Sequence, residues 1–311
     1  MVKNLTEVIR TMAEQSSLEL PEEIPKLDLF NVKRAYQSAR ELQLYSSPIA
    51  GLFRRYLRTG GYPYAISAEV GKDLIPEGIY RQFQHAIREE MRKAGRRETY
   101  FRELVGWAVN KYLGKEFSWS AASSDTHIGS KNTARNYLED GEGVFIWHIM
   151  NRIINIGEPT PAPKSPKKLY TLDPFCWHSL KSWVEGHPEP WGYALEVLGD
   201  EDFLGGFVES VIGDHLKRQF GYFALYHRAS QGQEEIDFVV HRAPEEYSLV
   251  EVKYRSRLKR GDREYLAKYG GGILASKNQL DFNEQNNVVD IPVHSFLAGL
   301  PKDLTLFSAR D

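Results

Sequence analysis

The chain has very little cysteine: Cys176 is the single one among 311 residues. One thiol excludes an internal disulfide framework and a zinc site built from several thiolates. Long apolar runs are also missing, because no stretch approaches the ~18 apolar residues that cross a bilayer. The N-terminus, MVKNLTEVIR, lacks the apolar run of a signal peptide. We therefore expect a cytoplasmic protein that has no membrane partner.

An excess of charge of one sign is absent too. Lys and Arg total 40 against 42 for Asp and Glu, so the net charge of −2 does not indicate a polyanion partner. The distribution is uneven, since residues 251–268 carry seven basic side chains against three acidic ones. Such a cluster on its own indicates a solvated face. The length and the hydrophobic content of 41% predict more than one folded core.

Prolines and lysines gather in one segment, GEPTPAPKSPKK (157–168), which predicts an extended linker. Before it, apolar residues at spacings of three and four predict helices at 31–57 and 78–94. After the linker, we expect a short strand (169–177), a turn (180–183) and one long helix (202–220). Four strands of a mixed sheet should follow, at 222–226, 236–240, 248–252 and 272–275. A basic helical segment (263–269) should lie before the last of them.

The sharpest motif is the pair of apolar strands EIDFVV and SLVEVKYR, which carry Asp237, Glu251 and Lys253. Side chains alternate along a strand, so Glu251 and Lys253 project to one face. A hairpin would bring Asp237 beside Glu251, and two adjacent carboxylates require a cation. Oxygen ligands favour Mg²⁺ or Mn²⁺ over zinc. The metal would polarise a phosphate and acidify a water, and Lys253 would position that water or stabilise developing charge.

A third acid lies upstream. Glu209 interrupts the apolar stripe of the helix 203–220, where a carboxylate costs free energy unless it has a partner. The predicted metal would be that partner. Glu251-Val252-Lys253 is also the single acid-x-Lys triplet of the chain. The alternative interpretation of the triplet alone is a surface salt bridge at a strand end.

A helix Glu, a strand Asp and a strand Glu-x-Lys together resemble the PD-(D/E)xK, or restriction-endonuclease-like, nucleases. Four segments look like the C-terminal half of a large prokaryotic AAA-type ATPase family: KLYTLDPFCWHSL, GGFVESVIGDHLKRQF, LYHRASQGQEEIDFVV and SLVEVKYR. A fifth segment, FRRYLRTGGYPYAI, resembles the helix and turn just beyond the ATPase core of that family. The similarity spans about 52–277. In that family a winged helix and a PD-(D/E)xK domain follow the ATPase core.

The resemblance implies site residues. It makes Glu209, Asp237 and Glu251 the metal ligands and, with Lys253, the catalytic quartet. Arg228 and Glu235 match accompanying polar positions. The chain departs from the family in having no G-x-x-x-x-G-K-[ST] loop, so we expect no ATP hydrolysis by this chain. An AAA-type ATPase would then be a separate partner or a lost core.

The region before the linker resembles a winged helix-turn-helix. FRELVGWAVNKYL is amphipathic, and Ser130 is a suitable N-cap for a helix that follows it. In a DNA-reading version this helix, 132–138, enters the major groove, where Lys131, Asn132 and Arg135 suit phosphates or base edges. The alternative is a packing or protein-contact module, because acidic residues follow at once.

We therefore predict an α/β protein whose helical extension (1–75) leads into a winged-helix domain (76–157). The linker (158–168) then precedes a restriction-endonuclease-like mixed-sheet domain (169–311). The expected function is that of a nucleic-acid-associated, Mg²⁺-dependent nuclease, with DNA as partner. Four further residues would lie beside the nucleic acid: Arg228 and, in the basic run, Arg255, Arg257 and Lys259. The alternatives are a catalytically silent docking or regulatory module of an AAA-type ATPase and a winged-helix transcription regulator. The sequence leaves homo-oligomerisation open.

Overall fold

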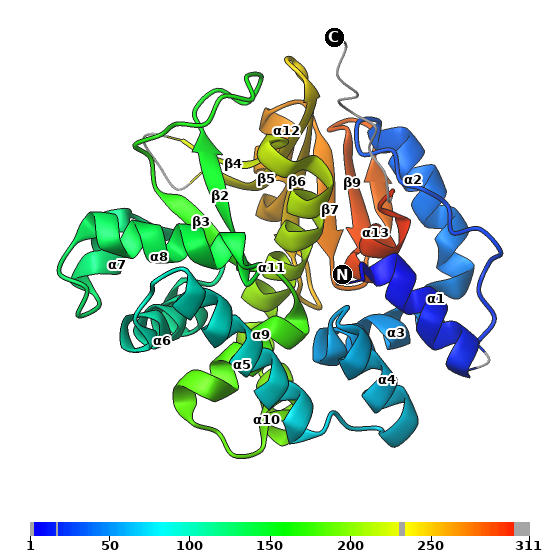
Figure 1. Cartoon of the computed structure of the whole chain (residues 1–311). Helices are drawn as coiled ribbons and strands as arrows, with labels where there is room; N and C mark the ends of the chain where they lie inside the picture. The colour runs from blue at the N-terminus through cyan, green and yellow to red at the C-terminus, as the bar shows by residue number, and fades with distance from the viewer. Residues whose placement is uncertain (1–2, 17, 230–233, 302–311) are drawn as a thin grey trace, which may run out of the picture. The chain divides into compact units, whose positions relative to one another are not determined.

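The structure, a computed structural model, describes residues 3–16, 18–229 and 234–301, so Ser230–Gln233 of the segment LYHRASQGQEEIDFVV lie outside the described residues. The chain is a mixed α/β protein with a helical N-terminal region and, in the described residues, a mixed sheet of nine strands (Figure 1). The predicted α/β fold class is confirmed. No described helix combines the length and the apolar character that a bilayer crossing needs.

The chain divides into two compact units, and each consists of three separate segments. Unit 1 comprises residues 1–4, 54–150 and 164–214. Unit 2 comprises residues 5–53, 151–163 and 215–311. The units interleave along the chain, whereas the domains predicted from the sequence follow one another. Each unit is therefore described by itself.

Unit 1 is mainly helical. Its elements are α4 (Pro63–Lys72), α5 (Glu77–Lys93), α6 (Glu98–Trp107), the π-helical segment η2 (Ala108–Tyr112), β1 (Glu116–Phe117), α7 (Trp119–Ser124), α8 (Lys131–Gly143), β3 (Lys167–Thr171), α9 (Pro174–Glu185) and α10 (Pro190–Leu198). Three elements continue from one unit into the other: α3 (Ser46–Thr59), β2 (Trp147–Ile153) and α11 (Glu201–Phe220). The expected helices at 78–94 and 202–220 are thus present as α5 and α11.

The region after the linker differs from the expectation at 174–177 and at 180–183, because the expected strand 169–177 ends at Thr171 and is followed by α9. The predicted turn lies inside α9, because Asp173 begins a helix there: its Oδ1 accepts a hydrogen bond from the Phe175 N–H at 2.8 Å, and Pro174 occupies the first turn. Lys167 and Lys168, the end of the predicted linker, are the first two residues of β3 and are buried.

Unit 2 holds most of the sheet. Its elements are α1 (Leu5–Ser16), α2 (Val32–Glu41), η1 (Leu42–Tyr45), η3 (Gly221–Phe223), β4 (Ala224–Arg228), β5 (Glu235–Ala243), β6 (Glu246–Lys253), η4 (Arg260–Arg263), α12 (Glu264–Lys268), β7 (Gly272–Ser276), β8 (Asp281–Asn283), β9 (Val288–Pro292) and α13 (Val293–Gly299). The four expected strands are β4, β5, β6 and β7. The strands β8 and β9 and the helix α13 were not expected.

The strand order of the sheet is β1-β3-β2-β4-β5-β6-β7-β9-β8. In unit 1, β1 and β3 are antiparallel. In unit 2, β4, β5 and β6 are consecutive antiparallel strands, and β6, β7 and β9 are parallel. Every residue of β7 and β9 is buried, as parallel strands usually are. The helix α12 lies over β5, β6 and β7 (Figure 1) and closes an apolar core around Leu266.

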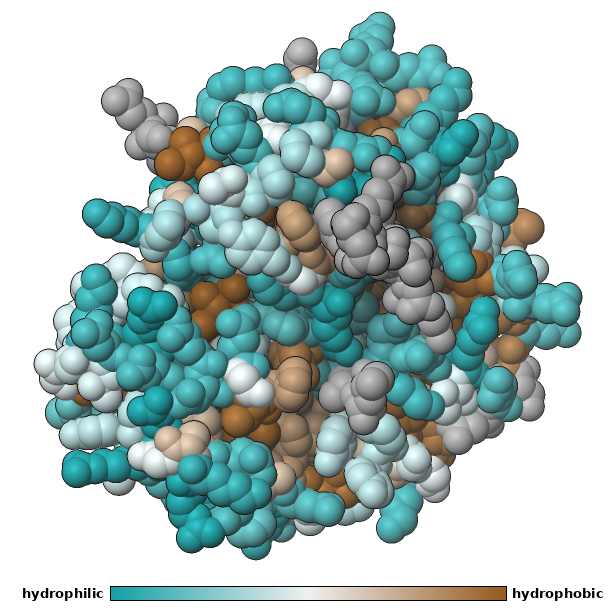
Figure 2. Space-filling model, turned by 45° about the horizontal axis from the view of Figure 1, so that its top comes forward, coloured by the Kyte–Doolittle hydropathy of each residue, from teal (hydrophilic) through white to brown (hydrophobic). Residues whose placement is uncertain are grey.

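Polar side chains cover most of the face shown in Figure 2, and apolar residues lie among them in small separate groups. The large hydrophobic residues that are exposed come from different elements, and include Leu44, Phe145 and Tyr222. Single exposed apolar residues are normal on a protein surface. This face alone therefore does not identify a binding site.

Candidate functional site

The hairpin of β5 and β6 brings two of the predicted ligands together. The strands are antiparallel with Phe238 opposite Val250, so the next pair along is Asp237 and Glu251. The Asp237 N–H donates to Oε2 of Glu251 at 3.3 Å, and the Val252 N–H donates to Oδ2 of Asp237 at 2.9 Å. Both carboxylates belong to buried residues. The antiparallel register of the predicted hairpin thus places these two acids side by side.

Lys253, the last residue of β6, completes this group. Its ammonium pairs with Oε1 of Glu251. Burial, together with the negative charge of Asp237, raises the pKa of Glu251 to about 8, although Lys253 opposes this shift. Near neutral pH, Glu251 therefore retains a proton in a large fraction of molecules that hold no cation. A divalent cation would replace that proton.

The donor set suits a hard cation. Carboxylate oxygens are the ligands of Mg²⁺ and Mn²⁺, and Mg²⁺ commonly takes one or two protein carboxylates while keeping several waters. Asp237 and Glu251 supply two such groups. Among the described residues, no group of three or more His, Cys, Asp and Glu side chains is arranged to hold a metal ion. The pair would therefore hold a cation that retains open positions for water or phosphate.

Glu209 has a different environment. It lies on the part of α11 that belongs to unit 1, whereas Asp237 and Glu251 belong to unit 2. Its Oε1 accepts hydrogen bonds from Nζ of Lys168 at 2.9 Å and from the Tyr170 hydroxyl at 2.8 Å. The ammonium of Lys168 and the hydroxyl of Tyr170 therefore satisfy this carboxylate, a role that was expected of the predicted metal. Its place in the metal site stays a prediction.

Lys168 was missed as a partner of Glu209 because it is the last residue of the predicted linker, and Tyr170 was missed although it lies in the predicted strand 169–177. In KKLYT, Lys168 and Tyr170 are two residues apart, so a strand places them on one face. That alternation was the available signal. The prolines just before this segment extended the predicted linker to Lys168, so the strand was expected to begin two residues later than it does.

The predicted phosphate-contacting residues of unit 2 fall into two groups. Arg255 pairs with Asp262, and Arg228 pairs with Glu235 at 3.3 Å. Arg257 and Lys259 are exposed, and no ion pair to a described residue is observed for either. Arg257 and Lys259 are therefore accessible to a polyanion, whereas Arg255 and Arg228 each form an ion pair with a carboxylate of this chain.

Asp262 is a residue that sequence reasoning missed. Its side chain accepts from Arg255 and from the Lys259 N–H, the latter at 2.7 Å. Burial disfavours its charge, but these hydrogen bonds prevail and hold its pKa below the usual value. Asp262 therefore holds the side chain of Arg255 and the backbone of Lys259 within the basic run. Its distance of seven residues from Arg255 gave no periodic pattern.

The predicted recognition helix is α8. The Ser130 hydroxyl accepts from the Thr133 N–H at 3.4 Å, so the predicted N-cap is confirmed. Lys131 and Asn132 are exposed in the first turn. Arg135 pairs with Glu139 at 2.7 Å. All three predicted contact residues lie on this one helix in unit 1, separate from those of unit 2.

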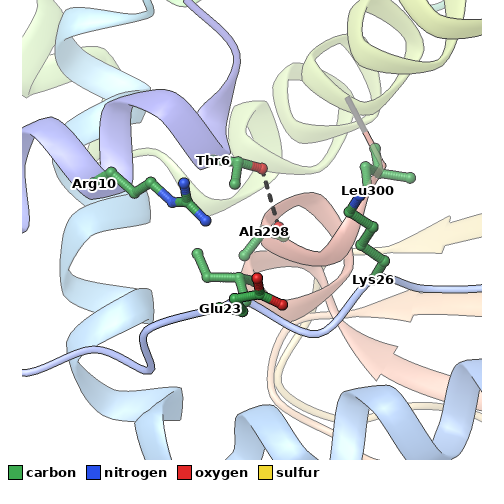
Figure 3. Close-up of a pocket in the computed structure, with 7 residues that line it drawn as sticks. Thr6, Arg10, Glu23, Lys26, Ala298 and Leu300 are labelled. Atoms are coloured by element: carbon green, nitrogen blue, oxygen red, sulfur yellow. Dashed lines mark hydrogen bonds between the residues drawn. The ribbon is translucent and has the colours of Figure 1, made fainter. Parts of the chain in front are cut away.

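A pocket of about 280 Å³ lies in unit 2 between α1, the segment before α2 and the end of α13 (Figure 3). The Thr6 hydroxyl donates to the Ala298 carbonyl at 3.0 Å. Three charged residues, Arg10, Glu23 and Lys26, also line the pocket. Its remaining lining residues are Ile24 and Leu300. None of the predicted site residues lines this pocket.

Comparison with protein families gives one match: residues 204–295 match a family model described as "Domain of unknown function (DUF4143)". This C-terminal domain is often found in proteins associated with AAA-type ATPases. The matched region contains α11 from residue 204 onward and the strands β4 to β9, and therefore Asp237, Glu251 and Lys253. Comparisons with curated proteins and with solved structures give no significant match.

Proposed function

We propose that this protein is a nucleic-acid-associated nuclease that hydrolyses phosphodiesters with a divalent cation held by Asp237 and Glu251. One observation carries the proposal: two buried carboxylates on neighbouring strands lie together, with one ammonium group beside them. Without a divalent cation the site avoids two adjacent buried charges by keeping a proton on Glu251, and a bound cation would take the place of that proton. The PD-(D/E)xK resemblance assigns the same three residues.

Each residue of the group has a role in this proposal. A bound Mg²⁺ would supply a Lewis acid for the phosphate and a water of lowered pKa. The ammonium of Lys253, held by Glu251, would stabilise negative charge that develops on the phosphate oxygens. Arg257 and Lys259 would contact flanking phosphates, so that nucleic-acid binding weakens with salt.

DNA docking through unit 1 is part of the same proposal. The elements α6, β1, α7, α8, β2 and β3 follow one another in the order of a winged helix-turn-helix, and their strands are arranged β1-β3-β2. This order supports the winged-helix interpretation. Lys131 and Asn132, in the exposed first turn of α8, are the groups that would reach the groove, since Arg135 is paired with Glu139.

A second candidate keeps the fold without the catalysis: a silent docking or regulatory module of an AAA-type ATPase. Two observations favour it. Glu209 already has an ammonium and a hydroxyl as partners, and the DUF4143 match belongs to ATPase-associated proteins. A winged-helix transcription regulator remains the third alternative, and it would require sequence-selective binding that depends on α8.

Cleavage of DNA tests the proposal. With Mg²⁺ or Mn²⁺, the protein should cut plasmid or single-stranded DNA, and EDTA should stop the reaction. Asp237→Asn and Lys253→Met should each lower the rate about 100-fold or more, because each removes a group that acts on the reacting phosphate. DNA binding, measured in EDTA, should persist. Glu284→Gln, an exposed carboxylate of the same unit, is the matched control and should retain the rate.

Metal binding without cleavage separates the two candidates. Mn²⁺ should raise the melting temperature of the wild type and of Glu284→Gln, but not that of Asp237→Asn, because a ligand that binds the folded state stabilises it. Mn²⁺ binding with no cleavage of any DNA would support the silent module. A wild type that shows neither Mn²⁺-dependent stabilisation nor metal-dependent cleavage would disprove the metal site itself.

A further inference from the structure

A row of aromatic side chains connects η2, β1 and α7 within unit 1. The ring of Phe117 packs edge-on against the rings of Tyr112 and Trp119, with centroid distances of 6.4 Å and 5.4 Å. Phe117 is buried, whereas Tyr112 and Trp119 are partly exposed. The buried ring therefore holds two partly exposed rings in fixed positions.

A cation lies over each of the two partly exposed rings. Nζ of Lys111 is 5.3 Å from the ring centroid of Tyr112, and the guanidinium carbon of Arg135 is 5.8 Å from that of Trp119. The quadrupole of an aromatic ring attracts a cation at this distance. Both cations are open to solvent, since 60% of the Lys111 side chain and 52% of the Arg135 side chain are exposed. The face of the guanidinium that points away from Trp119 is therefore accessible.

Each of these cations is also held by a carboxylate. Asp125 accepts from the Lys111 ammonium at 2.6 Å, and Glu139 accepts from Nε of Arg135 at 2.7 Å. The contact with Glu139 and the contact with Trp119 together orient the plane of the Arg135 guanidinium. The two carboxylates offset the two positive charges. A ligand at this surface would therefore gain more from stacking than from net charge.

The backbone at one end of the row is unusual. Lys111 and Tyr112 belong to η2 (Ala108–Tyr112), which is the one π-helical segment among the described residues. Such turns are rare and occur frequently at functional sites. At the other end, Lys131 lies one helical turn before Arg135 on α8 and is exposed, and no ion pair to a described residue is observed for it. Lys131 therefore offers a positive charge beside the oriented guanidinium.

We propose that this surface of unit 1 binds single-stranded DNA by stacking an unpaired base on the guanidinium of Arg135, which itself stacks on Trp119. Lys131 would contact an adjoining phosphate. Arginine planes and aromatic rings accept any base, because every base has a π-face. In a duplex the neighbouring base pairs cover that face, so the oriented guanidinium selects an unpaired base. This inference rests on the proposed DNA docking by unit 1 and specifies which form of DNA is recognised.

Fluorescence anisotropy of the full chain with three labelled probes of equal length tests the proposal. The probes are oligothymidine, the same strand with abasic central nucleotides, and a duplex. EDTA is present throughout, so cleavage plays no part. Oligothymidine should bind about tenfold more tightly than the abasic strand, which has the same phosphates but no bases to stack. Arg135→Lys, which keeps the charge and removes the guanidinium plane, should abolish this preference and leave duplex binding unchanged.

Two further variants complete the experiment. Arg81→Lys is the matched control, because Arg81 is exposed on α5 of the same unit and forms the same kind of ion pair, with Glu77 four residues away. It should keep the preference for oligothymidine. Trp119→Leu, which removes the ring beneath Arg135, should lose that preference as Arg135→Lys does.

The outcomes separate this inference from the function on which it rests. Duplex binding by a wild type that does not distinguish oligothymidine from the abasic strand would overturn the inference and leave DNA docking in place. So would an Arg135→Lys variant that keeps the preference of the wild type. Failure to bind any of the three probes would overturn the proposed docking of DNA as well.

Discussion

At the scale of single residues, burial shifts the pKa of a titratable side chain away from its usual value. His178 on α9 is buried, and its Nε2 lies 2.9 Å from the Leu57 carbonyl, to which it donates. Burial lowers the pKa of His178 to about 4, because the protonated ring would lose its hydration, although the Leu57 carbonyl opposes this shift. The folded protein therefore holds this imidazole in its neutral form at neutral pH.

The stability of the protein should fall in mild acid because of His178. In the unfolded chain its pKa is about 6.5, so between pH 6.5 and pH 4 the unfolded state binds a proton that the folded state does not. The stabilising contribution is complete above pH 6.5 and is lost as the pH falls toward 4. His178→Gln, which can still donate to Leu57, should reduce the loss of unfolding free energy between pH 7 and pH 5 by about 2 kcal/mol.

Urea titrations at several pH values measure this effect. The unfolding free energy of the wild type should fall relative to that of His178→Gln as the pH is lowered from 7 to 5. An identical pH dependence of the two proteins would show that His178 is protonated equally in both states.

Two glycines of α8 should respond oppositely to the same substitution. A Cβ at Gly141 would lie 2.3 Å from the Trp147 ring, and that indole is fixed by donating to the Leu138 carbonyl at 2.7 Å. Gly141→Ala should therefore cost about 1–3 kcal/mol through overpacking. A Cβ at Gly143 would meet no atom within 4 Å, so Gly143→Ala should stabilise by about 0.5–1 kcal/mol. Chemical denaturation of both variants measures the difference, and equal effects would contradict this account.

At the scale of elements, the end of α8 combines ordinary hydrogen bonding with an unusual residue. The Ile146 N–H donates to the Gly141 carbonyl and the Phe145 N–H to the Glu142 carbonyl, both at 3.1 Å, which is the Schellman arrangement. Its left-handed position is usually glycine. Here it is Phe145, which has a φ of +61° and is 69% exposed. The backbone is strained without any gain from burial.

Phe145→Gly should consequently stabilise the protein. Glycine adopts this φ without steric cost, and little buried surface is lost, so the unfolding free energy should rise by about 1 kcal/mol. Differential scanning calorimetry would record a higher melting temperature. Phe145→Ala is the control, because it shortens the side chain but keeps the strained Cβ, and it should give less of the gain. A lower melting temperature for Phe145→Gly would mean that the ring makes a stabilising contact.

At the scale of the whole molecule, unit 2 depends on residues from both ends of the chain. The Leu5 N–H lies 3.1 Å from Nε2 of His215, and the Leu27 N–H donates to the Gly299 carbonyl at 2.8 Å. Tyr36 of α2 stacks on Phe282 of β8, with ring centroids 5.5 Å apart. The N-terminal helices therefore cover part of the C-terminal sheet.

A fragment that spans 169–311, the predicted nuclease-like domain, should not fold by itself. It lacks α1 and α2, which pack on α13 and β9, and so exposes apolar surface that the full chain buries. Limited proteolysis and binding of a hydrophobic dye should distinguish the fragment from the full chain. Addition of a peptide covering 1–53 should restore part of the protection. A fragment that resists protease as the full chain does would contradict the two-unit division.

The sequence by itself determined the features that depend on neighbouring residues. Alternation in EIDFVV and SLVEVKYR predicted the contact of Asp237 with Glu251, and Ser130 predicted the start of α8. The tertiary structure alone decided the pairing of Glu209 with Lys168, 41 positions away, and the capture of the Gly61 N–H by Asp173, 112 positions away. Periodicity and capping arise within a few residues, whereas such distant partners leave no pattern along the chain and meet only when the whole fold is formed.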